Sequence, residues 1–265
     1  MRAAHLLPRL GALHTGGVVT LCVTVMLTAA CAAAATEPSQ PTNTSVPPTA
    51  TERPTARPPS TPVRPQWVID FAQPILDDIR SRPPDFQDTF DLKSPHWVEE
   101  PECRQHGKIE IGGGKLLISN CPARYTAADF TDYVIEVDAA YEAGEHEQGG
   151  VLIEFRDRAC GFAIGWNSFV FAECGRDDTG VNARKGIQMK NYRWKERQAV
   201  TMLLIVKGPR FGFYIDGKPA DTFRDDRFAE GGWVLGGLGQ LGPDVYRLVS
   251  FDNLKVWDIT GLVLP

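Results

Sequence analysis

The stretch that most restricts the fold is residues 201–223, TMLLIVKGPRFGFYIDGKPADTF. Its first part is apolar at most positions, which predicts a strand buried on most of both faces, and Gly208-Pro209 ends that strand. Apolar residues then alternate up to Asp216-Gly217, a pair typical of a type I′ turn because both central residues need positive φ. Residues 218–223 return as a third strand. Three consecutive antiparallel strands must bury one face against a second sheet, so the sequence predicts a two-sheet β-structure.

The composition limits the partners of the chain. It has 265 residues, enough for one or two domains, and a net charge of −5. A negative balance argues against nucleic acid as the main partner. Hydrophobic residues at 43% and charged residues at 23% are ordinary for a globular protein that folds in water.

Residues 1–31 have the pattern of a secretory signal peptide. Two arginines precede an apolar stretch over residues 16–30, which is too short for a comfortable membrane span. The stretch ends in Leu27-Thr28-Ala29-Ala30-Cys31, which resembles the bacterial lipobox, although Thr28 stands where that motif usually has Leu. The resemblance implies a lipid on Cys31 that anchors an extracytoplasmic protein to the membrane. The alternatives are a secreted protein cleaved near residues 30–35, and a retained anchor.

Residues 32–65 form a low-complexity segment with nine Pro and seven Thr. Such a segment cannot bury enough apolar area to offset the entropy of ordering it. We therefore expect an extended, disordered linker between the membrane and the folded part.

Residues 66–84 carry apolar side chains at helical spacing, which predicts a short helical prelude that packs on the edge of the domain. Pro74 lies inside this pattern and should split or kink the helix. The apolar positions are Val68, Phe71, Ile75 and Ile79.

Residues 85–265 contain many short strand patterns separated by Gly, Asp and Asn, with no long amphipathic helix between them. This spacing predicts an all-β antiparallel sandwich of two sheets. The expected strands cover residues 108–111, 115–119, 132–141, 150–155, 161–165, 169–172, 184–190, 199–207, 211–215, 218–223, 233–238 and 246–257.

Five features of this part resemble a known family in the order in which they occur. They are Phe86, Phe90 and Trp97 at the start, the strand at 133–137, the run at 150–156, the hairpin at 213–218 and the closing segment at 251–256. Together they are similar to concanavalin A-like lectin/glucanase (jelly-roll) domains, near the laminin-G and 3-keto-disaccharide hydrolase branches. The resemblance implies a jelly-roll fold, and this fold hosts lectins, glycosidases and adhesion modules alike.

Four cysteines lie in the predicted sandwich. Cys103 and Cys121 are symmetric about the turn at 112–114, and Cys160 and Cys174 are symmetric about the turn at 166–168. Two Cys that face each other across an antiparallel pair can reach bonding distance, so we expect two hairpin disulfides, Cys103–Cys121 and Cys160–Cys174. The competing interpretation is a metal site, which neither CxxC pairs nor clustered His support.

The carboxylates at Glu136, Asp138 and Glu142 stand at even spacing and should share one face of a strand. Family-16 glycoside hydrolases carry a Glu-x-Asp-x-x-Glu strand on the same fold. Here the last Glu comes one residue late and Tyr141 holds its position, so Glu142 could replace it only through a bulge near residues 139–140. If these carboxylates have no catalytic function, they simply form the solvated face of a strand. If the chain is an enzyme, its catalytic candidates are Glu136, Asp138 and Glu154.

Sugar contacts are predicted on the next strand and on nearby aromatic residues. Glu154 and Arg156 should share a face, either as an ion pair with β-strand neighbours such as Glu136 or Asp138, or as polar contacts to sugar hydroxyls. Exposed aromatic rings could dock on the flat faces of sugars, and the carbohydrate-binding candidates are Trp166, Tyr192, Trp194, Glu154 and Arg156. Trp233 is expected in the core.

The sequence therefore favours a membrane-tethered, extracytoplasmic module that binds a glycan or glycoconjugate without catalysis. The alternatives are a glycoside or 3-keto-disaccharide hydrolase, and a structural or protein-interaction module. No cofactor is expected, although a calcium site at the charged loop Glu145-His146-Glu147 stays open.

Overall fold

A computed structural model describes residues 64–99, 107–127, 130–144, 149–165, 169–175, 183–187, 194–195, 197–228, 230–237 and 247–265. All of them belong to one compact unit, Ser60–Pro265. The expected signal peptide, Cys31 and most of the linker lie outside the described residues and stay predictions. Within the described ranges, we find no helix with the length and apolar character needed to cross a membrane.

The helical prelude is present and changes its geometry near Pro74. A π-helical turn, η1 (Val68–Ala72), leads directly into helix α1 (Gln73–Arg80). Pro74 lies in the first turn of α1, where the hydrogen-bonding pattern changes from π- to α-helical. The backbone stays helical across the junction, so the expected split of the periodic segment does not occur.

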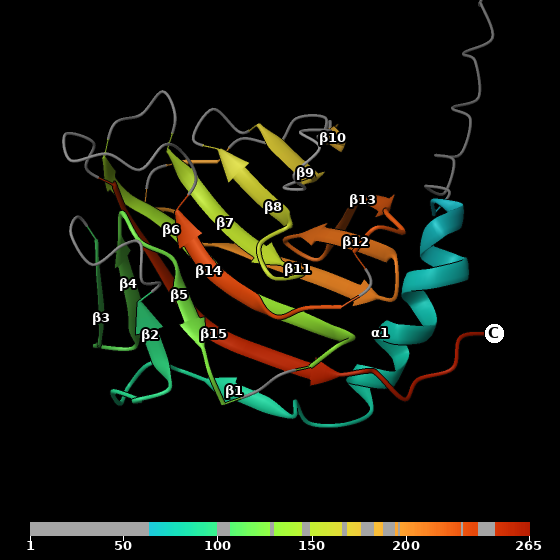
Figure 1. Ribbon diagram of the computed structural model, residues 1–265, viewed down its shortest axis with the longest axis horizontal. Coiled ribbons are helices and arrows are strands. Elements are labelled where there is room, and N and C mark those ends of the chain that lie inside the picture. The colour runs from blue at the N-terminus through green and yellow to red at the C-terminus, as the bar shows by residue number, and fades with distance from the viewer. Residues whose placement is uncertain are drawn as a thin grey trace, which may run out of the picture. The chain divides into compact units, whose positions relative to one another are not determined.

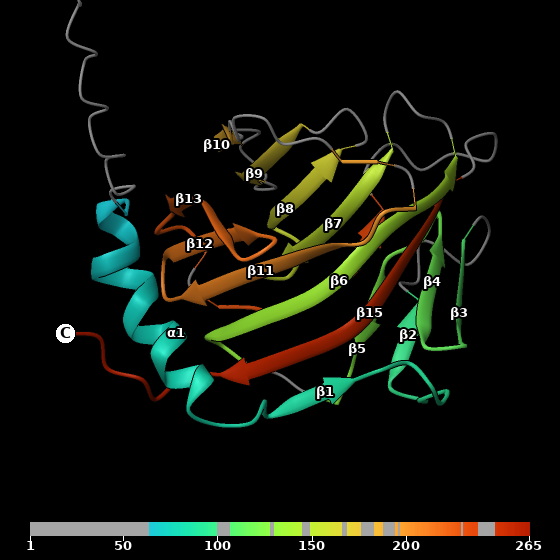
Figure 2. The same ribbon diagram turned by 180° about the vertical axis from the view of Figure 1, so that it is seen from behind.

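One layer of the domain is an eight-stranded antiparallel sheet, which Figure 2 shows in front. Its central strands β6 and β15 are the longest, with twelve residues each. β1 (Phe86–Asp88) pairs with the end of β15. The order of the remaining strands is β13 (Lys218–Arg224), β12 (Arg210–Ile215), β11 (Val200–Lys207), β6 (Tyr133–Gly144), β15 (Arg247–Asp258), β4 (Lys115–Ser119) and β3 (Lys108–Gly112).

The second layer is a seven-stranded antiparallel sheet, and Figure 1 shows it in front of the first. Its order is β10 (Ala183–Ile187), β9 (Val170–Cys174), β8 (Cys160–Gly165), β7 (Gly150–Phe155), β14 (Trp233–Gly237), β5 (Ala123–Tyr125) and β2 (Trp97–Glu99). The predicted all-β jelly-roll sandwich is confirmed. The three-residue strands β1, β2 and β5 are not among the expected strands, because three residues are too few to show an alternation.

The meander at 201–223 forms β11, β12 and β13 as predicted. Met202 lies opposite Ile215, and Leu204 lies opposite Phe213. Asp216 and Gly217 both have positive φ, at 49° and 70°, as the type I′ turn requires.

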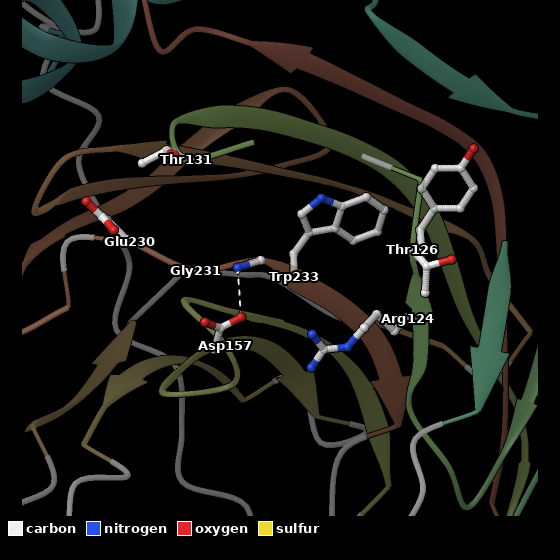
Figure 3. Close-up of a pocket in the computed structure, with 9 residues that line it drawn as sticks. Arg124, Thr126, Thr131, Asp157, Glu230, Gly231 and Trp233 are labelled. Atoms are coloured by element: carbon white, nitrogen blue, oxygen red, sulfur yellow. Dashed lines mark hydrogen bonds between the residues drawn. The ribbon is translucent and has the colours of Figure 1, made fainter. Parts of the chain in front are cut away.

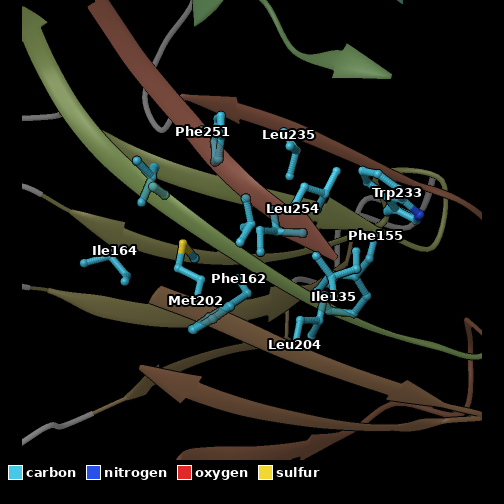
Figure 4. Packing of buried hydrophobic residues seen from close by; sticks show 14 of the residues in the cluster. Ile135, Phe155, Phe162, Ile164, Met202, Leu204, Trp233, Leu235, Phe251 and Leu254 are labelled. Carbon is cyan, nitrogen blue, oxygen red and sulfur yellow. The ribbon is translucent and has the colours of Figure 1, made fainter. Parts of the chain in front are cut away.

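The core lies between the two sheets and is built from alternate residues of each strand (Figure 4). Ile135 and Leu204 project into it from the eight-stranded sheet, and Phe155, Phe162 and Leu235 come from the other sheet. All five are fully buried. Burial of this kind contributes roughly 1.5–3 kcal/mol for each large apolar side chain, which is the main force that joins the two sheets.

The prelude packs on the outer face of the eight-stranded sheet, where Figure 2 shows α1 across the ends of β12, β11, β6 and β15. Phe71 and Ile75 of the prelude belong to one buried cluster with Ile205, Tyr214 and Trp257 of the sheet. The outer face is therefore divided into an apolar end under the helix and a polar stretch further along β6.

One of the two expected disulfides lies within the described residues. Cys160 and Cys174 face each other across β8 and β9 and form a disulfide, which confirms the predicted pairing. Cys121 is described and buried, but Cys103 lies outside the described residues, so the Cys103–Cys121 pairing stays a prediction.

Candidate functional site

The three carboxylates of β6 share the outer face of the eight-stranded sheet, as predicted. Ile135, Val137, Ala139 and Tyr141 of the same strand point into the core. Glu136, Asp138 and Glu142 point to the outer face. A Glu at position 141, where the family-16 pattern has its last Glu, would therefore point into the core.

Glu136 and Asp138 are both bound by neighbouring strands. Lys255 Nζ on β15 donates to Glu136 Oε1 at 2.8 Å. Thr201 Oγ1 on β11 donates to Asp138 Oδ1 at 2.6 Å, and Asn253 Nδ2 donates to Asp138 Oδ2 at 3.0 Å. Asn253 reaches this position from an irregularity of β15, where its φ is 52°. Cross-strand contacts therefore occupy both carboxylates.

Glu142 is held in the same way. Ser250 Oγ and Lys115 Nζ donate to Glu142 Oε1 at 2.6 and 2.7 Å. Partial burial raises the pKa of Glu142, but these hydrogen bonds and the charges of Lys115 and Arg197 outweigh it, so the pKa lies below its usual value. The register of β6 against β15 shifts at Glu142 itself, and not near residues 139–140, where a bulge would be needed for Glu142 to replace the family-16 Glu.

Glu154 lies in the other sheet and does not join these carboxylates. It projects from β7, in the seven-stranded sheet, whereas Glu136 and Asp138 belong to the other sheet. Its carboxylate accepts a hydrogen bond from Arg158 Nε at 2.9 Å. The hypothesis that the Glu154 and Arg156 face forms a cross-strand ion pair with Glu136 or Asp138 is therefore wrong, because β7 and β6 belong to different sheets.

Arg156 does not share a strand face with Glu154. Strand β7 ends at Phe155, and Arg156 begins a turn with a φ of 55°. Its side chain is buried and donates to the carbonyl oxygens of Thr131 and Gly208 at 2.5 and 2.6 Å. It also pairs with Asp132 at 3.4 Å. The expected contact of Arg156 with sugar is wrong, because a buried guanidinium that joins three segments is a structural anchor.

The predicted exposure of Trp194 is also wrong. Only 5% of the residue is exposed, and it belongs to the core between the sheets. Its indole Nε1 donates to the carbonyl oxygen of Gln198 at 2.8 Å, which satisfies the polar end of a buried ring. Trp166 and Tyr192 lie outside the described residues, so their predicted roles stay predictions.

A hollow of about 480 Å³ opens beside β5 and β14, and we call it the Trp233 pocket (Figure 3). Its volume lies within the range of about 300–1,000 Å³ that small-molecule sites usually have. Trp233 is buried in the core as predicted, and one side of it also faces this hollow. The described residues that line the pocket are Arg124, Tyr125, Thr126, Thr131, Asp157, Glu230, Gly231, Gly232 and Trp233.

Two aromatic side chains line the pocket and are fixed by other rings. Tyr125 stacks on Phe86 with ring centroids 4.1 Å apart, and Trp233 meets the edge of Trp97 at 6.0 Å. Burial raises the pKa of the Tyr125 phenol, and the nearby Asp88 carboxylate raises it further, so the hydroxyl stays protonated and can donate. The aromatic part of the lining is therefore rigid and carries a donor.

Two acids line the pocket: Figure 3 shows Glu230 near Thr131, and Asp157 beneath Gly231 on the side of Arg124. Asp157 Oδ1 accepts a hydrogen bond from the Gly232 N–H at 2.9 Å, drawn as the dashed line. No hydrogen bond or ion pair joins the exposed Glu230 carboxylate to any residue that the structure describes. The same holds for the Thr131 hydroxyl. The pocket thus offers polar groups that a ligand can still engage.

The wall that carries Asp157 is held in a strained conformation. Arg156, Asp157 and Arg158 have consecutive φ values of 55°, 53° and 70°. Such non-glycine residues cost of order 1–3 kcal/mol each and persist only where surrounding contacts hold them. Gly231 packs against this turn, and a Cβ on it would lie 2.7 Å from the Asp157 nitrogen. The buried Arg156 side chain holds the turn in place through its hydrogen bonds to the Thr131 and Gly208 carbonyl oxygens.

Sequence reasoning missed the residues of this pocket. Arg124 and Tyr125 lie on the three-residue strand β5, and Glu230 lies in the segment before β14. The signal that could have found them is the aromatic residue of β5 together with the Gly231-Gly232 pair that lets two segments approach closely.

No group of three or more His, Cys, Asp or Glu side chains arranged to hold a metal ion occurs among the residues with described positions. The charged loop at 145–147, where the sequence leaves a calcium site open, lies outside them.

Solved structures with the same fold are glycan-active proteins of low sequence identity. A prokaryotic β-1,3-1,4-glucanase (lichenase) from a mouse hindgut metagenome has 11% identity and a TM-score of 0.51, over 66% of this chain and 99% of that chain. An endo-acting O-glycanase of human gut bacteria has 11% identity and a TM-score of 0.52, with the same coverage. The Bacillus licheniformis β-glucanase has 10% identity and a TM-score of 0.50, over 65% and 97%.

These likenesses show that the domain has the concanavalin A-like lectin/glucanase fold, as the sequence features imply. No protein-family model matches the sequence, and no curated protein matches it either.

Proposed function

We propose that this chain is a membrane-tethered, extracytoplasmic module that binds carbohydrate without hydrolysing it. The observation that carries the proposal is the Trp233 pocket, where two fixed aromatic rings lie beside unengaged polar groups. Saccharides present apolar C–H faces together with hydroxyl groups, and sites that combine aromatic rings with a few placed polar groups recognise both. The solved structures of this fold named above are by name enzymes that act on glycans.

The absence of catalysis is inferred from the β6 carboxylates. Retaining glycosidases need two carboxyl groups about 5–5.5 Å apart, with one available as nucleophile and the other as acid and base. Cross-strand donors bind Glu136, Asp138 and Glu142, and Glu154 lies in the other sheet. These donors occupy the carboxylate oxygens that a nucleophile or an acid and base would have to offer to a substrate.

The test uses the full chain on a glycan array, followed by incubation with the strongest binder. Binding without new reducing ends or released keto-sugar supports the proposal. Turnover that disappears in Glu136→Gln would replace it with a hydrolase. A complete lack of glycan binding would leave a structural or protein-interaction module as the function of the domain.

The membrane tether rests on the sequence of residues 1–31 and is tested separately. Cys31→Ser should release the protein from the membrane fraction, because it removes the proposed lipid attachment site. A variant that stays membrane-bound and uncleaved would show that the segment is a retained anchor.

A further inference from the structure

We propose that the Trp233 pocket selects a short saccharide without acidic groups, an inference that rests on the proposed carbohydrate-binding function. The pocket is formed by the end of β5, the turn after β7, and the segments that lead into β6 and β14. Its volume of about 480 Å³ accommodates a short saccharide, within the range of ordinary ligand pockets.

The net negative charge of the residues that line the pocket favours neutral over acidic saccharides. Among the described residues that line it, Arg124 is the one cation, and Asp157 and Glu230 are two carboxylates. A uronate, sialate or sulfate group would add a further negative charge beside them, and like charges in one site repel each other. Neutral hydroxyl groups have the opposite effect, because they donate hydrogen bonds to carboxylates.

The two acids have different roles. Asp157 is a positioning residue, because its backbone N–H and its carboxylate bind the carbonyl oxygen and the N–H of Gly232 at 3.2 and 2.9 Å. Glu230 is exposed and makes no such contact within the described part of the chain. Its carboxylate is therefore the acceptor that a sugar hydroxyl can reach, and hydrogen bonds to a charged acceptor are stronger than those between neutral groups.

The aromatic residues of the pocket supply hydrogen-bond donors that complement the Glu230 acceptor. Tyr125 stacks on Phe86 and keeps its proton, and the indole Nε1 of Trp233 forms no hydrogen bond with any residue of the described ranges. Trp233 is 4% exposed, so these residues offer a ligand mainly two donors, the Tyr125 hydroxyl and the Trp233 N–H, and little apolar surface. A sugar bound to these donors can direct other hydroxyl groups towards Glu230 and Thr131, which lie across the pocket in Figure 3.

The anchored wall makes the pocket preorganised. Arg156 ties the strained turn to the segment before β6 and to the β11–β12 turn through Thr131 and Gly208. A wall held by buried contacts does not have to be ordered by the ligand, which reduces the entropy cost of binding a small molecule.

The experiment compares neutral oligosaccharides with their uronate- and sialate-bearing counterparts on one array, using the full chain. The strongest neutral binder is then titrated against Glu230→Gln, which keeps the shape of the side chain but removes its charge. We expect binding to the neutral set alone, and about a tenfold loss of affinity in Glu230→Gln. Glu110→Gln, which alters an exposed, ion-paired acid on β3, is the matched control and should bind as the unmodified protein does.

The outcomes separate this inference from the proposed function. Selective binding of acidic glycans, or equal affinity of Glu230→Gln and the unmodified protein for the neutral binder, would overturn the inference and leave the function in place. A chain that binds no glycan at all would overturn both.

Discussion

Along β6, each carboxylate faces a donor on a neighbouring strand, whereas in the Trp233 pocket the carboxylate of Glu230 faces the hollow. Lys255 binds Glu136, and Lys115 with Ser250 binds Glu142. Around the pocket, Arg156, Lys207 and the Gly208 N–H bind the buried Asp132. The Glu230 carboxylate and the Thr131 hydroxyl form no hydrogen bond with any described residue. Polar side chains that bind each other stabilise a surface, and polar side chains held apart by the backbone can recognise a partner.

The difference extends to the backbone. The β6 face is regular strand apart from register shifts against β15. The pocket wall instead contains three consecutive non-glycine residues with positive φ, packed against Gly231. Strain of this kind needs compensating contacts, and it occurs here beside a hollow and not beside the paired carboxylates. The experiments below therefore compare the two regions, from the largest expected effect to the smallest.

Replacement of the buried anchor should have the largest effect. Arg156→Leu leaves the buried Thr131 and Gly208 carbonyl groups without the donor that Arg156 provides, whereas the Asp132 carboxylate keeps Lys207 Nζ and the Gly208 N–H. A buried acceptor without a donor costs about 1–3 kcal/mol, so the free energy of unfolding should fall by about 2–6 kcal/mol in urea titrations. Lys255→Leu, which breaks the exposed pair with Glu136 on β6, is the control and should cost about 1 kcal/mol or less. Equal losses in both variants would contradict the distinction between the two regions.

Loss of the disulfide should come next. Cys160 follows the pocket turn directly and is joined to Cys174 across a separation of 14 residues. The double replacement Cys160→Ala and Cys174→Ala should lower the free energy of unfolding by about 3 kcal/mol, because the unfolded chain gains conformational freedom. It should also weaken glycan binding, since the turn at 156–159 loses its tether. Unchanged unfolding in both denaturant and heat would contradict this expectation.

Gly231→Ala tests the strained wall itself. The position has a φ of 124°, and an added Cβ would lie 2.7 Å from the backbone of the pocket turn, so we expect a loss of about 1–3 kcal/mol and weaker glycan binding. Gly232→Ala is a matched control in the next position, where the nearest contact to an added Cβ is 3.6 Å from Asp157 Oδ1. If both variants lose stability equally, the approach of Gly231 to the turn is not the cause.

The smallest effect concerns the pH dependence of the β6 face. The pKa of Glu142 is lowered in the folded state, so its charged form stabilises the fold above the ordinary Glu pKa of about 4.3. This contribution is lost as the pH falls through the lowered pKa. The stability difference between the unmodified protein and Glu142→Gln should therefore be at most about 1 kcal/mol at neutral pH and disappear in acid. A difference that grows on acidification would show the opposite sign of the shift.

Local patterns determined much of the fold. The apolar alternation of residues 201–223 and the Asp216-Gly217 pair predict the hairpin that the structure contains, because strand period and turn chemistry are properties of neighbouring residues. The symmetric spacing of Cys160 and Cys174 about one turn likewise predicts their disulfide. The even spacing of Glu136 and Asp138 places them on one face for the same reason.

The candidate site was decided by the tertiary structure. Whether Glu154 meets Glu136 depends on which sheet each strand joins, and the period of a strand carries no information on this. Trp194 and Arg156 have polar neighbours in sequence but are buried by segments far along the chain, so their surroundings cannot be derived from local pattern. The Trp233 pocket likewise exists because β5, β14 and two turns, distant in sequence, meet in space. The sequence by itself determined the strands and their faces, and only the packing of those strands decided which polar groups are satisfied and which remain available to a ligand.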